Sequence, residues 1–224
     1  IAKHKSDPTA KYCQLATAAV GGGASCRTWV FRGFWEDTGA LKFITDRRSR
    51  KIPEITADPA GEVCFYLTKT REQFRIKGTL QVVAAGESDE RLAKARKHQW
   101  TQISPSSQAS FATALIPGLE ALPVDDARDS AGGEGEHVRE VEPPSDPAEE
   151  FCLILLWPNL VDHLVLRDGQ TRHVHTLVVD RDVGEARSAV SPVSDVVSGG
   201  GGDEQQQKVG KEPSPEWSTV AVNP

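Results

Sequence analysis

RTWVFRGFWEDTGALKFITDRRSRK, residues 27–51, is the stretch of the sequence that decides the fold. Aromatic and aliphatic residues alternate with polar ones in its first and middle parts, which is the pattern of half-buried β-strands. Aspartate and glycine between these parts tolerate the backbone angles of a tight hairpin turn. The stretch therefore predicts, in order, a strand at 26–34, a turn at 37–39, a strand at 41–45 and a short helix at 50–56 with Ser49 as its N-cap.

The same stretch is a basic island in an acidic chain. It contains seven Lys and Arg residues and three Asp and Glu residues, a net charge of +4. The whole chain of 224 residues carries −6, so the remainder carries −10. Proteins that bind nucleic acids are usually basic over a whole face or domain. A confined island instead predicts a discrete anion as the ligand, and no nucleic acid.

The rest of the chain repeats the strand pattern and adds one clear helix. That helix spans 88–102 and begins at Ser88, which can cap it. Further strands are expected at 12–20, 62–68, 73–83, 151–157, 161–167 and 172–179. Closely spaced hairpins with one good helix indicate a mainly β fold, a small barrel of six to seven antiparallel strands with flanking helices.

Two segments differ in composition from the strands. Residues 125–150 hold ten acids, two bases and no aromatic residue, which predicts a disordered insertion. From about residue 184 the runs of Gly and Gln predict a low-complexity tail. We therefore expect one domain, 1–183, interrupted at 125–150 and followed by the tail 184–224.

Several observations bear on compartment and partners. The longest apolar run, 151–157, has seven residues, whereas a membrane-spanning helix needs about 20, so no membrane partner is expected. Four cysteines without a CxxC pair predict reduced thiols and a cytoplasmic location. The chain begins at Ile1 and lacks Met, so its start is expected to be missing or processed, and organelle targeting stays open. His173 and His175 have no third ligand at a suitable spacing, so no metal site is expected.

Four short motifs follow one another at characteristic spacings: Arg27-x4-Arg32, Phe43-Ile44-Thr45-Asp46, Ser49-Arg50-Lys51 and Gln73-x4-Gly78. They resemble the motifs of the pyridoxamine 5'-phosphate oxidase-like family of FMN-binding split barrels. The resemblance covers residues 12–120 and 151–180. It implies an FMN-binding split barrel, a homodimer with the flavin between two subunits, and flavin-dependent oxidation of a small-molecule substrate.

By this resemblance the flavin site falls on the basic island. Arg27, Arg50 and Lys51 would bind the phosphate of FMN through charge-assisted hydrogen bonds. The backbone at Val30 and Phe31, with Thr45 and Gln73, would contact the edge of the ring. The implied cofactor-binding set is Arg27, Val30, Phe31, Arg32, Thr45, Ser49, Arg50, Lys51 and Gln73.

The substrate site departs from the family pattern. The family carries Tyr-x3-Arg-x3-Ser on its long helix, and anchoring that pattern on Ser104 places Arg96 and Trp100 at the Tyr and Arg positions. An indole cannot replace a guanidinium at a phosphate. The implied substrate-binding set is Arg32, Arg96, Trp100 and Ser104, without an identified catalytic residue. We therefore expect normal FMN binding and slow or absent oxidation of pyridoxamine 5'-phosphate.

Three functions stay open at this point. The first is a flavin-dependent oxidoreductase, in which the protein positions flavin and substrate. The second is a flavin-binding protein without oxidase activity, such as a carrier, sensor or scaffold. The third is a split barrel adapted to another cofactor such as haem, for which His163 is a candidate ligand.

Overall fold

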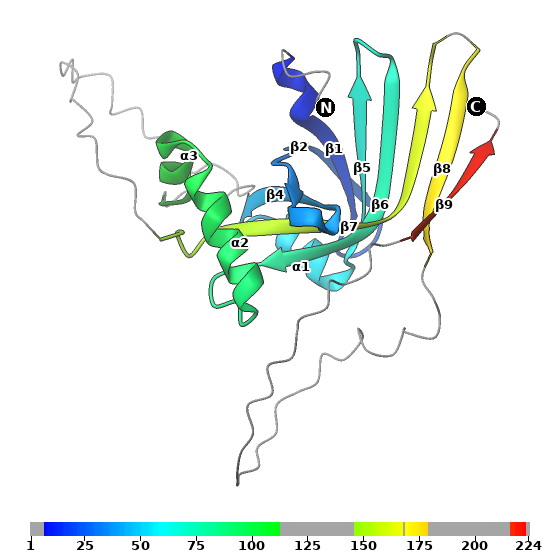
Figure 1. Ribbon diagram of the computed structural model, residues 1–224. Coiled ribbons are helices and arrows are strands. Elements are labelled where there is room, and N and C mark those ends of the chain that lie inside the picture. The colour runs from blue at the N-terminus through cyan, green and yellow to red at the C-terminus, as the bar shows by residue number, and fades with distance from the viewer. Residues whose placement is uncertain (1–6, 113–145, 168, 179–215, 223–224) are drawn as a thin grey trace, which may run out of the picture.

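The computed structural model describes residues 7–112, 146–167, 169–178 and 216–222 (Figure 1). The strands in these residues are β1 (Tyr12–Ala18), β2 (Ala24–Val30), β3 (Phe34–Trp35), β4 (Ala40–Asp46), β5 (Ala60–Leu67), β6 (Glu72–Val83), β7 (Phe151–Val165), β8 (Thr171–Val178) and β9 (Glu216–Val222). The helices are α1 (Lys51–Ala57), α2 (Glu90–Thr101) and α3 (Pro105–Ala109), with short 3-10 helices at Pro8–Lys11, Glu36–Thr38 and Ser110–Ala112.

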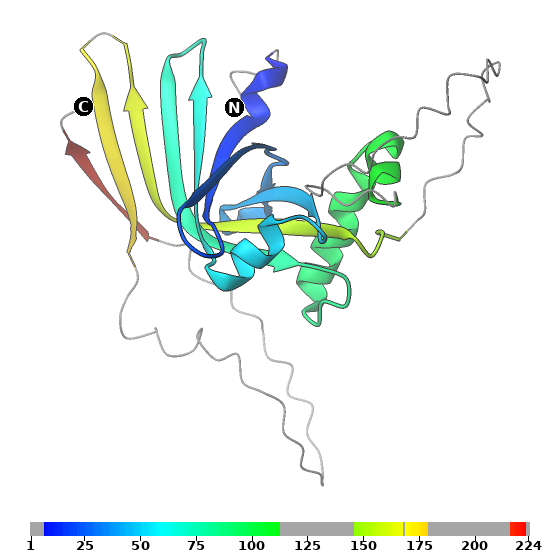
Figure 2. The same ribbon diagram turned by 180° about the vertical axis from the view of Figure 1, so that it is seen from behind.

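All described strands belong to one antiparallel sheet. Its order is β2-β1-β5-β6-β7-β4-β3, with β8 paired to β7 and β9 paired to β8. In Figures 1 and 2 the hairpins β5–β6 and β7–β8 extend side by side away from α2, and β9 lies at the outer edge. The expected mainly β architecture with flanking helices is confirmed. The described part has nine strands where six to seven were predicted, because β3 has only two residues and β9 lies in the expected tail.

Strand β7 corrects the predicted pair of strands at 151–157 and 161–167. It is one strand of 15 residues that pairs with β4 and β6 in its first part and with β6 and β8 in its second. Pro158 does not end it, because the register shifts at the partner residues Lys77 and Gly78, and such a bulge tolerates a missing N–H. At Gly78 a Cβ atom would lie 2.0 Å from the carbonyl oxygen of Trp157, so only glycine fits there.

The core of the barrel is aromatic at its centre. Trp29 meets Phe43 edge to face with ring centroids 5.3 Å apart, and Phe31 meets Phe65 at 5.6 Å. A second cluster, which includes Trp35, lies between the sheet and α2. Aromatic residues bury large apolar areas and so dominate the stabilisation of such a core. This packing fixes β2 and β4 side by side at one end of the barrel.

Both helix starts differ from the prediction. Arg50 is the N-cap of α1 and makes no capping hydrogen bond with its side chain, where Ser49 was expected. Asp89 caps α2 in place of Ser88, and its carboxylate accepts from the backbone N–H groups of Arg91 and Leu92. A carboxylate one residue closer to the helix satisfies two free N–H groups, which explains the shift.

The two segments of unusual composition are partly described. Residues 125–145 of the expected insertion and 184–215 of the expected tail lie outside the described residues. The last five residues of the insertion, 146–150, instead make defined contacts: Lys97 lies 2.6 Å from Asp146, and Arg47 lies 2.5 Å from Glu149. Strand β9 lies within the expected tail and pairs with β8 over seven residues. These contacts lie within segments for which composition predicted no structure, and the domain bounds 1–183 and 184–224 stay predictions.

Candidate functional site

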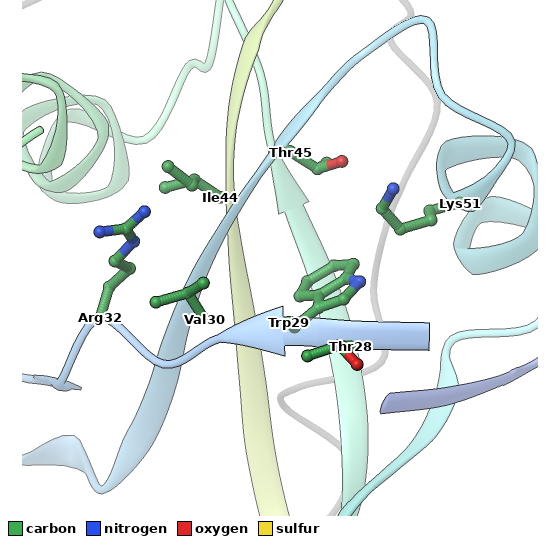
Figure 3. Close-up of a pocket in the computed structure, with 7 residues that line it drawn as sticks. All are labelled: Thr28, Trp29, Val30, Arg32, Ile44, Thr45 and Lys51. Atoms are coloured by element: carbon green, nitrogen blue, oxygen red, sulfur yellow. The ribbon is translucent and has the colours of Figure 1, made fainter. Parts of the chain in front are cut away.

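A pocket of about 260 Å³ lies where β2 and β4 meet the start of α1. Its lining combines an apolar middle with one cation at each end. In Figure 3, Arg32 and Lys51 lie on opposite sides of Trp29 and Val30. The full lining is Thr28, Trp29, Val30, Arg32, Ile44, Thr45 and Lys51.

Lys51 forms one end of the pocket. It is the first residue of α1, and its Nζ atom lies 5.7 Å from the centre of the Trp29 ring. Burial lowers the pKa of Lys51, and the charge of Arg27 lowers it further, whereas Glu54 and Asp46 act in the opposite direction. A cation that is already partly removed from water is stabilised by an anion bound next to it.

Arg27 lies beside Lys51, outside the pocket lining. Its Nη2 donates to Glu54 over 2.5 Å, and its Nη1 donates to the hydroxyl of Thr17 and to the carbonyl of Ser25. Burial raises the pKa of Glu54, but hydrogen bonds from Thr17, Arg27 and Ser25 outweigh it, so this pKa lies below its usual value. Arg27 is therefore held by an ionised carboxylate.

Two hydroxyl residues follow at the end of β4. Thr45 and Ser49 are buried, and their side-chain oxygens lie 3.2 Å apart. Next to them, Asp46 accepts from the backbone and the guanidinium of Arg48. Burial raises the pKa of Asp46, and these bonds lower it below its usual value. The Asp46 charge is thus neutralised locally by Arg48.

Arg32 forms the other end of the pocket. Burial lowers its pKa, and its Nε atom is buried without a hydrogen-bond partner among the described residues. The indole Nε1 of Trp29 is in the same condition. Buried donors without acceptors are costly unless a ligand or water satisfies them. The pocket therefore suits a ligand that carries acceptor atoms and a negative charge.

The comparisons with known proteins agree with this chemistry. Residues 1–84 match the family described as "Pyridoxamine 5'-phosphate oxidase, FMN-binding domain". The chain is also 38% identical over 159 residues to pyridoxine/pyridoxamine 5'-phosphate oxidase 2 of Arabidopsis thaliana, covering 71% of this chain and 75% of the relative. The chain belongs to the pyridoxamine 5'-phosphate oxidase-like family.

Two solved structures share the fold of this chain. A pyridoxamine 5'-phosphate oxidase-related, FMN binding protein from Nostoc punctiforme is 32% identical, with a TM-score of 0.72 and coverage of 100% of this chain and 93% of that chain. PhzG from Burkholderia lata 383 is 17% identical, with a TM-score of 0.61 and coverage of 100% and 88%. The latter likeness shows the fold alone. The chain is a split barrel of this family.

Of the residues that the family motifs assigned to the flavin, the structure brings four to the pocket lining: Val30, Arg32, Thr45 and Lys51. Phe31 points into the core, and its backbone N–H donates to the carbonyl of Lys11. Ser49 reaches the site through Thr45, and Arg50 is exposed at the start of α1. Thr28, Trp29 and Ile44 also line the pocket but were not in the implied set. Thr28 lies on the same strand face as Val30, so the alternation in β2 contained the signal to find it.

Gln73 lies away from this pocket. It is on β6, opposite Tyr66 of β5 and Leu164 of β7. The pairing register places it on the same sheet face as Thr28, three strand spacings away. Three spacings amount to roughly 14 Å. Within one chain Gln73 and the pocket therefore do not meet.

The three residues assigned to the substrate on the long helix do not line the pocket either. The guanidinium of Arg96 donates to the carbonyls of Phe151 and Ala148, over 2.9 and 2.6 Å. Trp100 is 1% exposed and packs against Phe151. Ser104 is the N-cap of α3. The contacts of Arg96 and Trp100 join α2 to the start of β7.

In the described ranges, no three His, Cys, Asp or Glu side chains are grouped as a metal site requires. No helix in that part of the chain combines the length and the apolar character needed to cross a bilayer.

Proposed function

We propose that this chain binds FMN in the pocket between Arg32 and Lys51. The observation that carries the proposal is the apolar bed of Trp29 and Val30 with a desolvated cation at each end. The ribityl phosphate would lie at the Lys51 end, where Arg27 adds a second cation. The unsatisfied N–H groups of Trp29 and Arg32 would donate to acceptor atoms of the ligand.

We further propose that the chain is a flavin-dependent oxidoreductase acting on a small molecule. The Arabidopsis relative, named an oxidase, supports this reaction class. Flavin, when bound, supplies hydride acceptance and electron transfer to oxygen. The residues of this chain would bind and orient the flavin: Lys51 neutralises the phosphate, Trp29 and Val30 keep water from one side of the pocket, and Arg32 holds a positive charge at the far end.

The substrate is a separate question from the reaction class. Arg96 and Trp100 are engaged in contacts within the chain, so they do not offer a phosphate grip above the pocket. Of the two cations in the predicted substrate set, Arg32 and Arg96, Arg32 lines the pocket. We propose slow oxidation of pyridoxamine 5'-phosphate and a less anionic natural substrate.

We propose a homodimer as the functional form. Ligand sites usually measure about 300–1,000 Å³, and this pocket of about 260 Å³ is smaller. Gln73 lies on the sheet face that carries Thr28, so a second copy laid on this face could bring its own Gln73 to the pocket. Light scattering tests this directly: a monomer that retains flavin at nanomolar concentration contradicts it.

A flavin carrier without oxidase activity is the second candidate. It is favoured because the side chains of Arg96 and Trp100 are engaged in contacts within the chain and do not face the pocket. Haem finds less support. His163 stacks on Phe74 with ring centroids 4.2 Å apart, and its Nε2 lies 3.1 Å from a carboxylate oxygen of Glu72. Both contacts would have to be rearranged before this histidine could bind iron.

A visible spectrum of the purified protein tests the cofactor. Bound flavin gives bands at about 370 and 450 nm, whereas haem gives a Soret band. If the protein has neither, reconstitution with FMN and with riboflavin follows, and failure of both flavins to bind contradicts the proposal. Oxygen consumption with pyridoxamine 5'-phosphate then separates an oxidase from a carrier. Robust turnover with a micromolar KM would show that the substrate proposal is wrong.

A further inference from the structure

Glu54 is a buried carboxylate beside the pocket that the family motifs do not include. It lies on α1 one turn after Lys51 and is 7% exposed. Its Oε2 accepts from the hydroxyl of Thr17 over 2.6 Å and from Nη2 of Arg27 over 2.5 Å. Its Oε1 accepts from the hydroxyl of Ser25 over 2.9 Å. One side chain therefore connects α1 with β1 and β2.

The charge of Glu54 is maintained by these partners. Burial alone raises the pKa of a carboxyl, but the three hydrogen bonds hold the pKa of Glu54 below its usual value. A buried carboxylate that is ionised and fully bonded is fixed in position, because any rotation leaves a charge without partners. Glu54 thus fixes the guanidinium it contacts.

Arg27 keeps part of its donor set free. A guanidinium has five N–H groups, and three of those on Arg27 are used by Thr17, Ser25 and Glu54. The other two, on Nε and on Nη2, have no partner among the described residues. Nε and Nη2 lie on one side of the guanidinium, in the fork geometry that suits an oxyanion. Arg27 lies on the same face of β2 as Trp29, and Nζ of Lys51 lies 5.7 Å from the centre of the Trp29 ring. The two cations are therefore neighbours, and the charge of Arg27 accordingly lowers the pKa of Lys51.

We propose that Glu54 is a positioning residue of the phosphate site. It holds Arg27 so that the free Nε and Nη2 edge faces the anion bound by Lys51, without itself touching the ligand. This inference rests on the proposed FMN site. Holding a flexible cation in its binding geometry removes an ordering cost from binding, which is the basis of preorganisation.

The negative charge of Glu54 also acts on the phosphate, in the opposite direction. Position and charge can be separated by two substitutions. Glu54→Asp keeps the charge but is one methylene shorter, so it cannot reach Arg27, Thr17 and Ser25 together. Glu54→Gln removes the charge but keeps the length of the side chain. Its amide still offers an oxygen that accepts from Arg27 and a polar group that can bond the hydroxyls of Thr17 and Ser25. Position and charge therefore predict opposite orders of phosphate affinity for the two variants.

The experiment measures the affinity of the full chain for FMN and for riboflavin and compares their ratio between variants. We expect Glu54→Asp and Glu54→Ala to lower the FMN-to-riboflavin ratio by about fivefold, the loss expected when one long side chain must be ordered on binding. Glu54→Gln should stay within about twofold of the wild type. The ratio is internal to each preparation, so a general loss of stability does not change it. Glu36→Ala, which breaks the exposed pair with Arg91, is the matched control.

The outcomes separate this inference from the proposed function. A wild-type chain that does not prefer FMN over riboflavin contradicts the proposed function itself. A ratio that depends on Lys51 but is unchanged in Glu54→Asp overturns the positioning role alone. Tighter FMN binding by Glu54→Gln with an unchanged Glu54→Asp also overturns it, because charge rather than position would then govern the site. If Glu54→Ala does not fold, the Asp and Gln variants still decide.

Discussion

Replacing Lys51 by Ala tests the phosphate end of the pocket most directly. Lys51 lines the pocket and is desolvated in the free protein, as the lowered pKa indicates. A hydrogen bond to a charged group contributes about 1.5–3 kcal/mol. The ammonium of Lys51 is already largely removed from water when the chain folds, so most of this hydrogen-bond energy is available for binding. We therefore expect Lys51→Ala to weaken FMN binding by about 2 kcal/mol. This corresponds to roughly a 30-fold higher Kd.

The assay is fluorescence titration with FMN and riboflavin. Riboflavin lacks the phosphate, so its Kd should change by less than about twofold. Lys94→Ala, on the exposed face of α2, is the control for loss of a lysine. The FMN affinity of the wild type should also decline as the pH rises and Lys51 loses its proton. Because the pKa of Lys51 is lowered, this decline should begin at a lower pH than for an ordinary lysine, and Lys51→Ala should remove it. Equal losses for FMN and riboflavin would refute the assignment of the phosphate end.

Three further predictions concern stability. Hydrogen bonds from Arg172 and Arg75 hold the pKa of Asp162 at about 2, below its usual value of 3.8. This carboxylate should therefore contribute about 2 kcal/mol to the unfolding free energy above pH 4, and the contribution should be lost as the pH falls towards 2. Urea unfolding of the wild type and of Asp162→Asn between pH 2 and 7 measures this loss, and equal acid sensitivity of the two proteins contradicts it. Gly78→Ala should destabilise the chain by about 2–4 kcal/mol because its Cβ meets backbone, whereas Gly61→Ala meets only the side chain of Leu80 and should cost less. Arg96→Ala should lower the unfolding free energy by about 2–3 kcal/mol through loss of the two charge-assisted hydrogen bonds to the carbonyls of Ala148 and Phe151, and it should leave the FMN Kd unchanged; a large change in the FMN Kd with normal stability would show that Arg96 acts on the pocket.

Sequence alone was sufficient for the fold class, and the family motifs include four of the seven residues that line the pocket, whose roles toward a cofactor stay predictions. The alternation in 27–51 predicted β2 and β4, and the family motifs identified Val30, Arg32, Thr45 and Lys51. These features depend on local periodicity and on motifs within about 25 residues of one another, which a sequence displays directly. Family membership follows from the same motifs and from the comparison with the Arabidopsis relative.

Contacts between distant segments were decided by the tertiary structure. Strand β9 forms on the edge of β8 some 40 residues earlier, and its WSTVAV run is too short to outweigh the Gly and Gln runs before it in a sequence reading. Residues 146–150 are held by Arg96 and Arg47. Charge and composition describe a segment, but they do not specify the partners that it meets.

The roles of individual polar residues were likewise decided in three dimensions. Arg96 carries the guanidinium expected of a phosphate ligand, yet this group donates to the carbonyls of Ala148 and Phe151 at the start of β7. Glu54 has no motif at all, yet folding brings it to Arg27 across 27 residues of sequence. The physical reason is that the energy of a buried charge depends on its partners and its desolvation, and both are properties of the assembled structure. The sequence determined which groups are present near the pocket between Arg32 and Lys51, and the tertiary structure determined which of them have contacts within the chain.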